Sequence, residues 1–240
     1  LVCPILPSAV TAIGALLYLA TATLCVVTAT ADPGIIPRNA LMDDAEAAAN
    51  AATTRTVEVN GQMLPLKWCN TCRIWRPPRA SHCSECNCCV ERFDHHCPWM
   101  GQCIGARNYR FFIGFVVSLS SLCLYTAVAS LAGFLHLMGI SNLPEVADRI
   151  DEAFRKSPAT AVLVVFPLLV LLCVAPLGCY HASLLCRNRT TSEDIKGTYD
   201  DHSPFEGSCV QNCHEPLCLP LEPSRIHPRS AASEQLGASM

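Results

Sequence analysis

Charge is what this sequence has little of. Only 15% of its 240 residues are charged, whereas 51% are hydrophobic. Residues 1–31 contain no Asp, Glu, Lys or Arg, and two further uncharged runs cover residues 111–138 and 159–185. This scarcity excludes an ordinary soluble domain and indicates a membrane protein. The net charge of −3 does not indicate which kind of membrane protein this is.

Each uncharged run exceeds the roughly 20 residues that a helix needs to cross a bilayer. We therefore predict an α-helical integral membrane protein with spans at residues 1–31, 111–138 and 159–185. The first run lacks the basic start and the short apolar core of a signal peptide, so a membrane span is the preferred interpretation. Because the chain starts abruptly in apolar sequence without Met, we expect it to begin inside a longer protein.

Basic residues beside these runs predict the orientation. Residues 32–110 hold nine Lys and Arg, whereas residues 139–158 hold three. Because basic segments favour the cytosolic side, residues 32–110 and the tail are expected in the cytosol, and residues 139–158 form a lumenal loop. Residues 32–66 are a linker, residues 186–221 a cytosolic element and residues 222–240 a disordered tail. The sequence does not distinguish a Golgi, endoplasmic reticulum or plasma membrane.

A second feature is the density of metal-binding side chains in a cysteine-rich domain at residues 67–110. Eight cysteines and three histidines gather there: Cys69, Cys72, His82, Cys83, Cys86, Cys88, Cys89, His95, His96, Cys97 and Cys103. Two Cys-x-x-Cys pairs among them are typical of structural zinc sites. Two such sites use eight ligands and leave three side chains over. With few long apolar runs to form a core, this domain is expected to need zinc for folding.

The tetrapeptide Asp94-His95-His96-Cys97 stands out chemically. A carboxylate can orient an imidazole, and an imidazole can take the proton of a thiol, which together make an activated nucleophile. The alternative is that all four residues are ligands or support ligands. Spacing alone does not decide between the two interpretations.

Smaller features allow weaker predictions. The turn at Asn60-Gly61 predicts a tight hairpin, and residues 39–60 fit either a polar helix or a loose linker. His136 and His181 are expected to have no chemical role in the spans. The tail cysteines fit a third metal site, lipid attachment points or buried small residues, with His214 as the one nearby further ligand; they are Cys209, Cys213 and Cys218.

Residues 69–112 resemble the cysteine-rich domain of the DHHC family of protein S-acyltransferases. The matching residues are Asp94-His95-His96-Cys97-Pro98-Trp99, Cys103-Ile104-Gly105, Asn108 and Phe112. Asp32-Pro33-Gly34 resembles the family's DPG motif and residues 190–193 its TTxE motif. Pro204-Phe205 with Gly207 and Asn212 resembles its C-terminal element. The family usually has four spans, so the three predicted here correspond to the last three.

The resemblance implies ligands and roles that spacing leaves open. Asp94, His95 and Cys97 would be catalytic, and Cys88 would be spare. One structural Zn(II) would take Cys69, Cys72, His82 and Cys89. A second structural Zn(II) would take Cys83, Cys86, His96 and Cys103.

The activity that this resemblance implies is protein S-palmitoylation. An acyl group from palmitoyl-CoA would pass through Cys97 to cytosolic cysteines of membrane-associated proteins, with the spans supplying an acyl cavity. Arg73, Arg76 and Arg79 are weak candidates for CoA phosphate contacts. An accessory subunit is a possible partner, and no nucleic acid is expected. The alternative is an inactive, membrane-anchored zinc scaffold or a truncated isoform.

Overall fold

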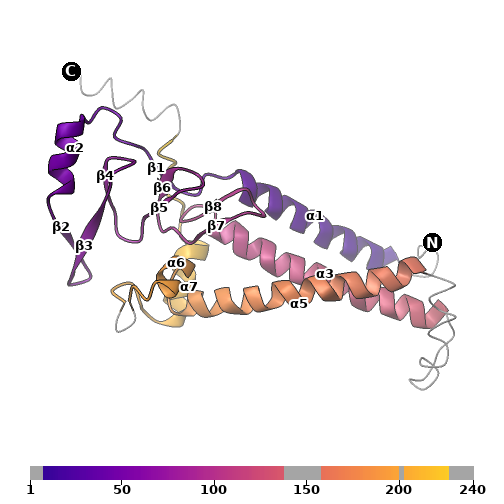
Figure 1. Cartoon of the computed structure of the whole chain (residues 1–240). Coiled ribbons are helices and arrows are strands. Elements are labelled where there is room, and N and C mark those ends of the chain that lie inside the picture. The colour runs from indigo at the N-terminus through magenta and orange to yellow at the C-terminus, as the bar shows by residue number, and fades with distance from the viewer. Residues whose placement is uncertain (1–7, 138–157, 200–202, 227–240) are drawn as a thin grey trace. The chain divides into compact units, whose positions relative to one another are not determined.

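The computed structural model describes residues 8–137, 158–199 and 203–226, which belong to two compact units (Figure 1). The membrane unit comprises Leu1–Val26 and Ile113–Tyr180. The cysteine-rich unit comprises Val27–Phe112 and His181–Met240. Two parts of the chain that are separated in the sequence by the second and third predicted spans therefore belong to one unit.

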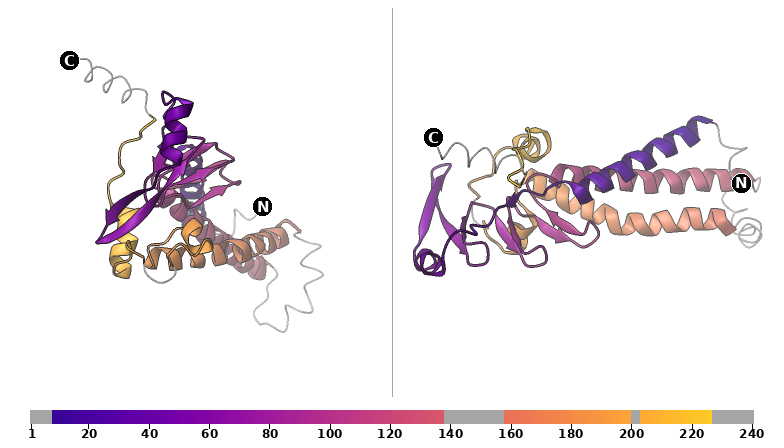
Figure 2. Two further views of the ribbon diagram at one scale, coloured as in Figure 1. Left: turned by 60° about the vertical axis from the view of Figure 1, so that its left-hand side comes forward. Right: turned by 90° about the horizontal axis from the view of Figure 1, so that it is seen from above.

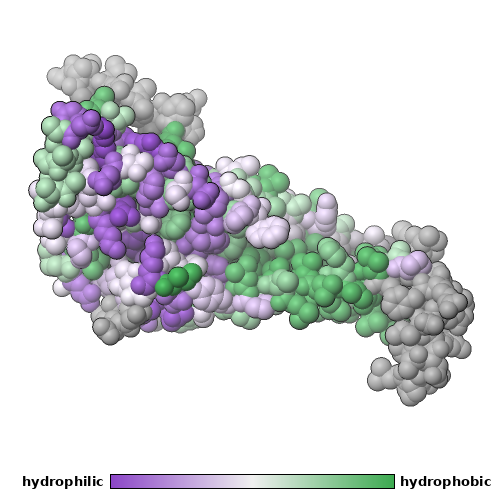
Figure 3. Space-filling view, viewed as in Figure 1, coloured by the Kyte–Doolittle hydropathy of each residue, from purple (hydrophilic) through white to green (hydrophobic). Residues whose placement is uncertain are grey.

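Among the described residues, three helices are long and apolar enough to cross a membrane: α1 (Ser8–Thr30), α3 (Tyr109–Leu137) and α5 (Pro158–Cys186). The mean hydropathies of their apolar windows are 2.1, 2.0 and 2.8. The three predicted spans are confirmed, although α3 begins two residues earlier than predicted. Hydrophobic side chains dominate the surface over these helices (Figure 3). The predicted lumenal loop lies almost entirely outside the described residues.

Small residues mark where the helices of the membrane unit pack closely. A Cβ atom on Gly14 would lie 3.2 Å from the ring of Tyr125, whose hydroxyl donates a hydrogen bond to the carbonyl of Val10. Similarly, a Cβ on Gly114 would lie 3.3 Å from Leu24. The right view of Figure 2 shows α3 between α1 and α5. Close packing through small residues is the usual association of helices in a membrane.

The described part of the cysteine-rich unit contains three small antiparallel sheets. Their strand orders are β1-β6-β5, β2-β3-β4 and β7-β8. The strands are β1 (Ile35–Ile36), β2 (Arg55–Val59), β3 (Gln62–Cys69), β4 (Ile74–Arg76), β5 (Ser81–Cys83), β6 (Cys88–Val90), β7 (His95–Cys97) and β8 (Gln102–Ile104). The two core clusters of these sheets consist mostly of cysteines, with Ile36 in one and Val90 in the other, and Ile104 of β8 is also fully buried. So small an apolar core provides little stability by itself.

Local sequence explains the first hairpin and the first short helix. Strands β2 and β3 pair through Val59 and Gln62, and the two turn residues between them are Asn60 (φ 48°) and Gly61 (φ 79°). These positive φ angles are those of the tight turn that Asn-Gly favours, so the predicted hairpin is confirmed. Upstream, the side chain of Asp43 caps α2 (Asp44–Ala51), so residues 39–60 include the polar helix.

Short capped helices follow α5. They are α6 (Thr191–Ile195) and α7 (Cys209–Cys218), and both begin with a capping box. A close backbone approach requires glycine at position 105. A Cβ atom there would lie 2.6 Å from the carbonyl oxygen of Pro33 and 2.5 Å from Val90. The Asp32-Pro33-Gly34 turn can therefore pack against the end of β8.

Candidate active site

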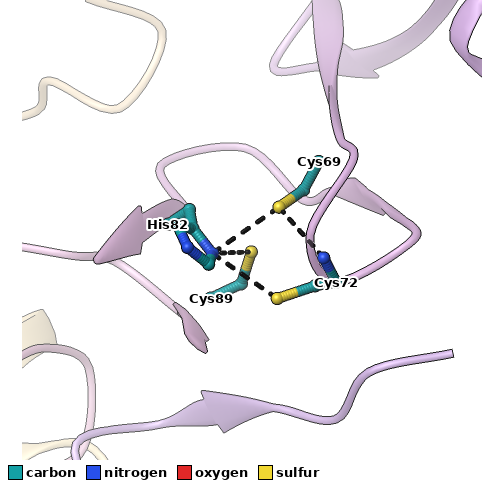
Figure 4. Close-up of side chains that lie close together, drawn as sticks. All are labelled: Cys69, Cys72, His82 and Cys89. Atoms are coloured by element: carbon teal, nitrogen blue, oxygen red, sulfur yellow. Dashed lines mark hydrogen bonds between the residues drawn. The ribbon is translucent and has the colours of Figure 1, made fainter. Parts of the chain in front are cut away.

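Four side chains form the first candidate metal site (Figure 4): Cys69, Cys72, His82 and Cys89. The Nδ1 atom of His82 lies 3.6, 3.5 and 3.8 Å from the Sγ atoms of the three cysteines. A tetrahedral zinc ion with bonds of about 2.3 Å to sulfur and about 2.0 Å to nitrogen needs nitrogen–sulfur separations of about 3.6 Å. The residues therefore fit Zn(II).

The second candidate metal site has the same composition and size: Cys83, Cys86, His96 and Cys103. Here Nδ1 of His96 lies 3.6, 3.4 and 3.9 Å from the three Sγ atoms. The structure thus brings together the same two groups of four that the resemblance implies. Cys88 lies outside both groups, and burial raises the pKa of its thiol to about 11.

Three hairpins in this unit share one turn. Each places a cysteine at the end of its first strand, followed by four loop residues whose last member has a positive φ angle. The three cysteines are Cys69, Cys83 and Cys97, and the three residues with positive φ are Arg73 (φ 52°), Asn87 (φ 51°) and Gly101 (φ 67°). Corresponding positions are 14 residues apart, so the hairpins form a structural repeat.

The third hairpin departs from this repeat at the ligand position. Cys72 and Cys86 occupy the third loop position of the first two hairpins, whereas Met100 occupies it in the third. Cys97 therefore has the backbone setting of a zinc ligand but belongs to neither metal group. The 14-residue spacing is visible in the sequence and could have indicated this difference.

Alternation along β7 places the candidate metal ligand and the candidate nucleophile on opposite faces. Successive residues of a strand point to opposite faces, so His96 faces one side while His95 and Cys97 face the other. His96 pairs with Cys103 across the hairpin, and both belong to the second metal site. One strand thus contributes to the metal site on one face and to a thiol–imidazole pair on the opposite face.

Asp94 precedes β7 and is almost completely buried, with 2% of its surface exposed. Its Oδ2 atom lies 2.7 Å from Nδ1 of His95 and accepts a second hydrogen bond, also 2.7 Å, from Oγ1 of Thr191. Its Oδ1 atom accepts a 2.9 Å hydrogen bond from the backbone N–H of Thr191. Burial alone would raise the pKa of Asp94, but these hydrogen bonds outweigh it and lower that pKa.

The pKa values of His95 and Cys97 move in opposite directions. Burial disfavours the imidazolium, but hydrogen bonds with Asp94 and Cys97 outweigh it and raise the pKa of His95 to about 9. Burial also disfavours the thiolate, yet the hydrogen bond with His95 and those from the backbone of Met100 and Trp99 lower the pKa of Cys97. The arrangement therefore favours a thiolate–imidazolium pair, which is a nucleophile ready to attack.

Comparison with known proteins agrees with this geometry. A model of the DHHC palmitoyltransferase family matches residues 62–198, which include both metal groups, β7 and Thr191. The chain belongs to the DHHC palmitoyltransferase family.

Relatives in this family are similar over most of the chain. A probable protein S-acyltransferase 6 of Arabidopsis thaliana is 40% identical over an alignment of 214 residues, and the match covers 84% of this chain and 51% of the relative. The palmitoyltransferase ZDHHC9 of Homo sapiens is 39% identical over an alignment of 244 residues, and the match covers 93% of this chain and 65% of the relative. The palmitoyltransferase ZDHHC18 of Rattus norvegicus is 38% identical over an alignment of 240 residues, and the match covers 92% of this chain and 60% of the relative. The chain thus spans about half to two thirds of these relatives' lengths.

The DHHC-family TTxE motif supports Asp94 from the far end of the chain. Thr190 caps α6, and the carboxylate of Glu193 accepts a 2.9 Å hydrogen bond from the backbone N–H of Thr190. This rigid turn presents Thr191 to Asp94. Sequence reasoning noted the motif but gave Thr191 no role, because 97 residues separate it from Asp94.

The sequence treated His181 as a histidine without a chemical role and did not indicate that its ring lies beside that of His95, with centroids 6.0 Å apart. The side chain of His181 is buried at 2% exposure, and its Nδ1 atom lies 3.1 Å from the hydroxyl of Tyr109. The ring of His181 packs edge-on against Phe112, with centroids 5.1 Å apart, and Phe112 packs edge-on against His95 at 5.3 Å. These rings pack around the imidazole of His95.

Of the three candidate arginines, Arg76 and Arg79 line the same groove, whereas Arg73 is not among its lining residues. Arg79 is buried and makes two 2.8 Å hydrogen bonds to the carboxylate of Glu193, so its donors are used within the protein, which argues against the predicted CoA contact. Arg73 pairs with Asp44 beside α2. Arg76 lines this groove, which has a volume of about 480 Å³, and remains a candidate.

Proposed function

We propose that this chain is a protein S-acyltransferase that moves a long-chain acyl group from acyl-CoA to cysteine thiols of membrane-associated proteins. The observation that carries the proposal is the pairing of Cys97 with His95 and Asp94, next to two metal groups but outside both. The names of the relatives, which are palmitoyltransferases and S-acyltransferases, support the same activity.

The proposed reaction has two steps. In the first, the Cys97 thiolate attacks the thioester carbonyl carbon of acyl-CoA, the carbon–sulfur bond to CoA breaks, and the His95 imidazolium gives its proton to the leaving CoA sulfur. In the second, His95 takes the proton of a substrate thiol, which attacks the acyl-enzyme and releases Cys97 as a thiolate. Asp94 holds the imidazole and stabilises its cation throughout.

The metal groups would have a structural part in this scheme. Two Zn(II) ions with four protein ligands each leave no open coordination position, so their contribution is to fold the hairpins. The chain's own residues then do the chemistry. Because β7 and β8 carry both a ligand pair and the nucleophile, the second metal site sets the position of Cys97.

A basic groove in the cysteine-rich unit fits the CoA part of the donor. Its volume is about 480 Å³, and Lys67, Arg76 and Lys196 line it together with the ring of Tyr199. Ammonium and guanidinium groups bind phosphates, and a tyrosine ring can stack on a base. We propose that this groove takes the CoA nucleotide on the cytosolic side of an endomembrane or the plasma membrane, with an accessory subunit as a possible partner.

Labelling with an alkyne analogue of palmitoyl-CoA tests the proposal on the chain in detergent micelles. We expect a label that hydroxylamine removes, because the link is a thioester. Cys97→Ser should reduce this label by at least about 10³-fold while the zinc content stays at two per chain. Cys88→Ser is the matched control, since Cys88 belongs to neither metal group. Equal labelling of wild type and Cys97→Ser would show that Cys97 is not the nucleophile, and no labelling at all would favour the inactive zinc scaffold.

A further inference from the structure

Three cysteines outside both metal groups converge in the cysteine-rich unit. The Sγ atoms of Cys186, Cys209 and Cys213 all lie within 4.8 Å of one another, and the three residues are not joined by disulfides. The sequence had placed Cys218 with Cys209 and Cys213. The structure instead adds Cys186 to these two, and Cys218 lies outside the group.

Two helices contribute the three thiols. Cys186 is the last residue of α5, and Cys209 and Cys213 are four residues apart on α7, so their side chains lie on one face of that helix. Cys186 and Cys209 are exposed and Cys213 is half-buried, so an ion can reach the group from solvent.

Buried amides fix α7 against the end of α5. Asn212, which is 2% exposed, donates a 2.7 Å hydrogen bond to the carbonyl of Cys186 itself. Asn188, also 2% exposed, donates 2.7 Å hydrogen bonds to the carbonyl of Phe205 and to the carboxylate of Glu215 on α7. The backbone positions of the three thiols are therefore set before any ligand binds, which favours a preorganised site.

The donor chemistry differs from that of the two zinc groups. Those groups combine three thiols with an imidazole, whereas this one contains only sulfur among the described residues. An ion bound in a trigonal plane with bonds of about 2.3 Å needs sulfur separations of about 4 Å, which small rotations of exposed side chains can reach. Three soft donors without a fourth ligand favour Cu(I) over Zn(II), which prefers four ligands.

We propose that Cys186, Cys209 and Cys213 form a third metal site, open to solvent, that takes a soft ion of the Cu(I) type. Binding replaces the three thiol protons, which pass to solvent, and forms three sulfur–metal bonds without any redox step. The site would tie the end of a membrane helix to α7 through the metal.

A copper titration of the zinc-loaded chain in micelles tests this site. One equivalent of Cu(I) is added anaerobically in competition with a chromophoric Cu(I) chelator, while a zinc-sensitive dye reports any zinc release. We expect wild type to retain one copper per chain and to release no zinc. Cys209→Ser and Cys186→Ser should lose this equivalent, whereas Cys218→Ser, the matched control on the same helix, should retain it.

The zinc readout makes the outcome decisive. If wild type binds copper only as zinc is released, the ion occupies a zinc site and the proposal is wrong. The proposal is also wrong if Cys209→Ser and wild type retain copper equally. Two zinc ions per chain in each variant show that the fold has survived the substitution. None of these readouts depends on acyltransferase activity.

Discussion

Hairpins β5-β6 and β7-β8 have the same turn, but the cysteine of the first belongs to a candidate metal site and that of the second does not. Each closes four loop residues between a terminal cysteine and its cross-strand partner, Cys83 with Cys88 and Cys97 with Gln102. In hairpin β5-β6 a second cysteine, Cys86, completes a candidate metal-binding pair with Cys83, whereas hairpin β7-β8 has Met100 at that position. The residue at this one loop position therefore differs between a candidate metal-binding hairpin and the hairpin that carries the proposed nucleophile.

The comparison shows how a reactive thiolate can arise from a zinc-binding turn. In the first hairpin of the repeat, the backbone N–H of Cys72 donates a 3.4 Å hydrogen bond to the sulfur of Cys69, which suits a metal-bound thiolate. The equivalent backbone N–H of Met100 lowers the pKa of Cys97. The turn stabilises negative charge on sulfur in both cases, and without metal ligation that charge is available for attack.

The largest expected effect comes from removing a ligand of the second metal site. Cys103→Ala should lose one of two zinc ions and all acyl-enzyme formation, because Cys103 pairs with His96 across the hairpin that carries Cys97. Zinc analysis and acyl-CoA labelling measure the two losses. Cys88→Ala, a free thiol in the neighbouring hairpin, should retain both. Full labelling of Cys103→Ala would show that the metal does not position the nucleophile.

A smaller but still large effect is expected on the other face of β7. His95→Ala should slow acyl-enzyme formation by about 10² to 10⁴-fold, the usual contribution of a positioned base, and keep both zinc ions. Stopped labelling reactions give the rate, and metal analysis gives the zinc content. Loss of zinc from this variant would contradict the alternation that separates His95 from His96.

An intermediate effect on the labelling rate is expected from removing the Thr191 hydroxyl, which hydrogen-bonds to Asp94. Thr191→Val removes a hydroxyl that hydrogen-bonds to the carboxylate at 2.7 Å but leaves the backbone contact in place. Hydrogen bonds to charged groups contribute about 1.5 to 3 kcal/mol, so we expect the labelling rate to fall by about 10 to 150-fold. Thr191→Ser, which keeps the hydroxyl, should restore most of the rate. A similar loss in both variants would indicate a packing role instead.

The smallest effect should appear only when zinc is added. Met100→Cys gives the third hairpin the thiol pair of the first two, so free zinc should bind Cys97 and inhibit labelling by about tenfold, since two thiols hold zinc more weakly than a complete set of four ligands. A chelator that leaves the two structural sites loaded should reverse the inhibition. Met100→Leu is the control, because it adds no ligand. Zinc-insensitive labelling of Met100→Cys would mean that the shared turn does not suffice for metal binding.

Much of this molecule could be predicted from local sequence. Long uncharged runs predicted the three spans, because burial in lipid excludes charge over the whole length of a helix. Asn60-Gly61 predicted its hairpin, because few residues tolerate two successive positive φ angles. The crowding of thiols and imidazoles predicted metal chemistry, and the resemblance supplied the same two groups of four that the structure brings together.

Contacts between side chains far apart in the sequence were determined by the tertiary structure alone. Thr191 hydrogen-bonds to Asp94, His181 packs beside the catalytic candidates, and Cys186 lies close to two cysteines of α7. No pattern among neighbouring residues in the sequence predicts these contacts. Arg79 was a weak candidate for a CoA phosphate contact, and only the folded chain shows that its guanidinium hydrogen-bonds to Glu193. By itself, the sequence determined the spans, the turns and the kinds of ligand, since these depend on neighbouring residues. Which distant side chains meet depends on how the helices and hairpins pack, and only the folded chain fixes that.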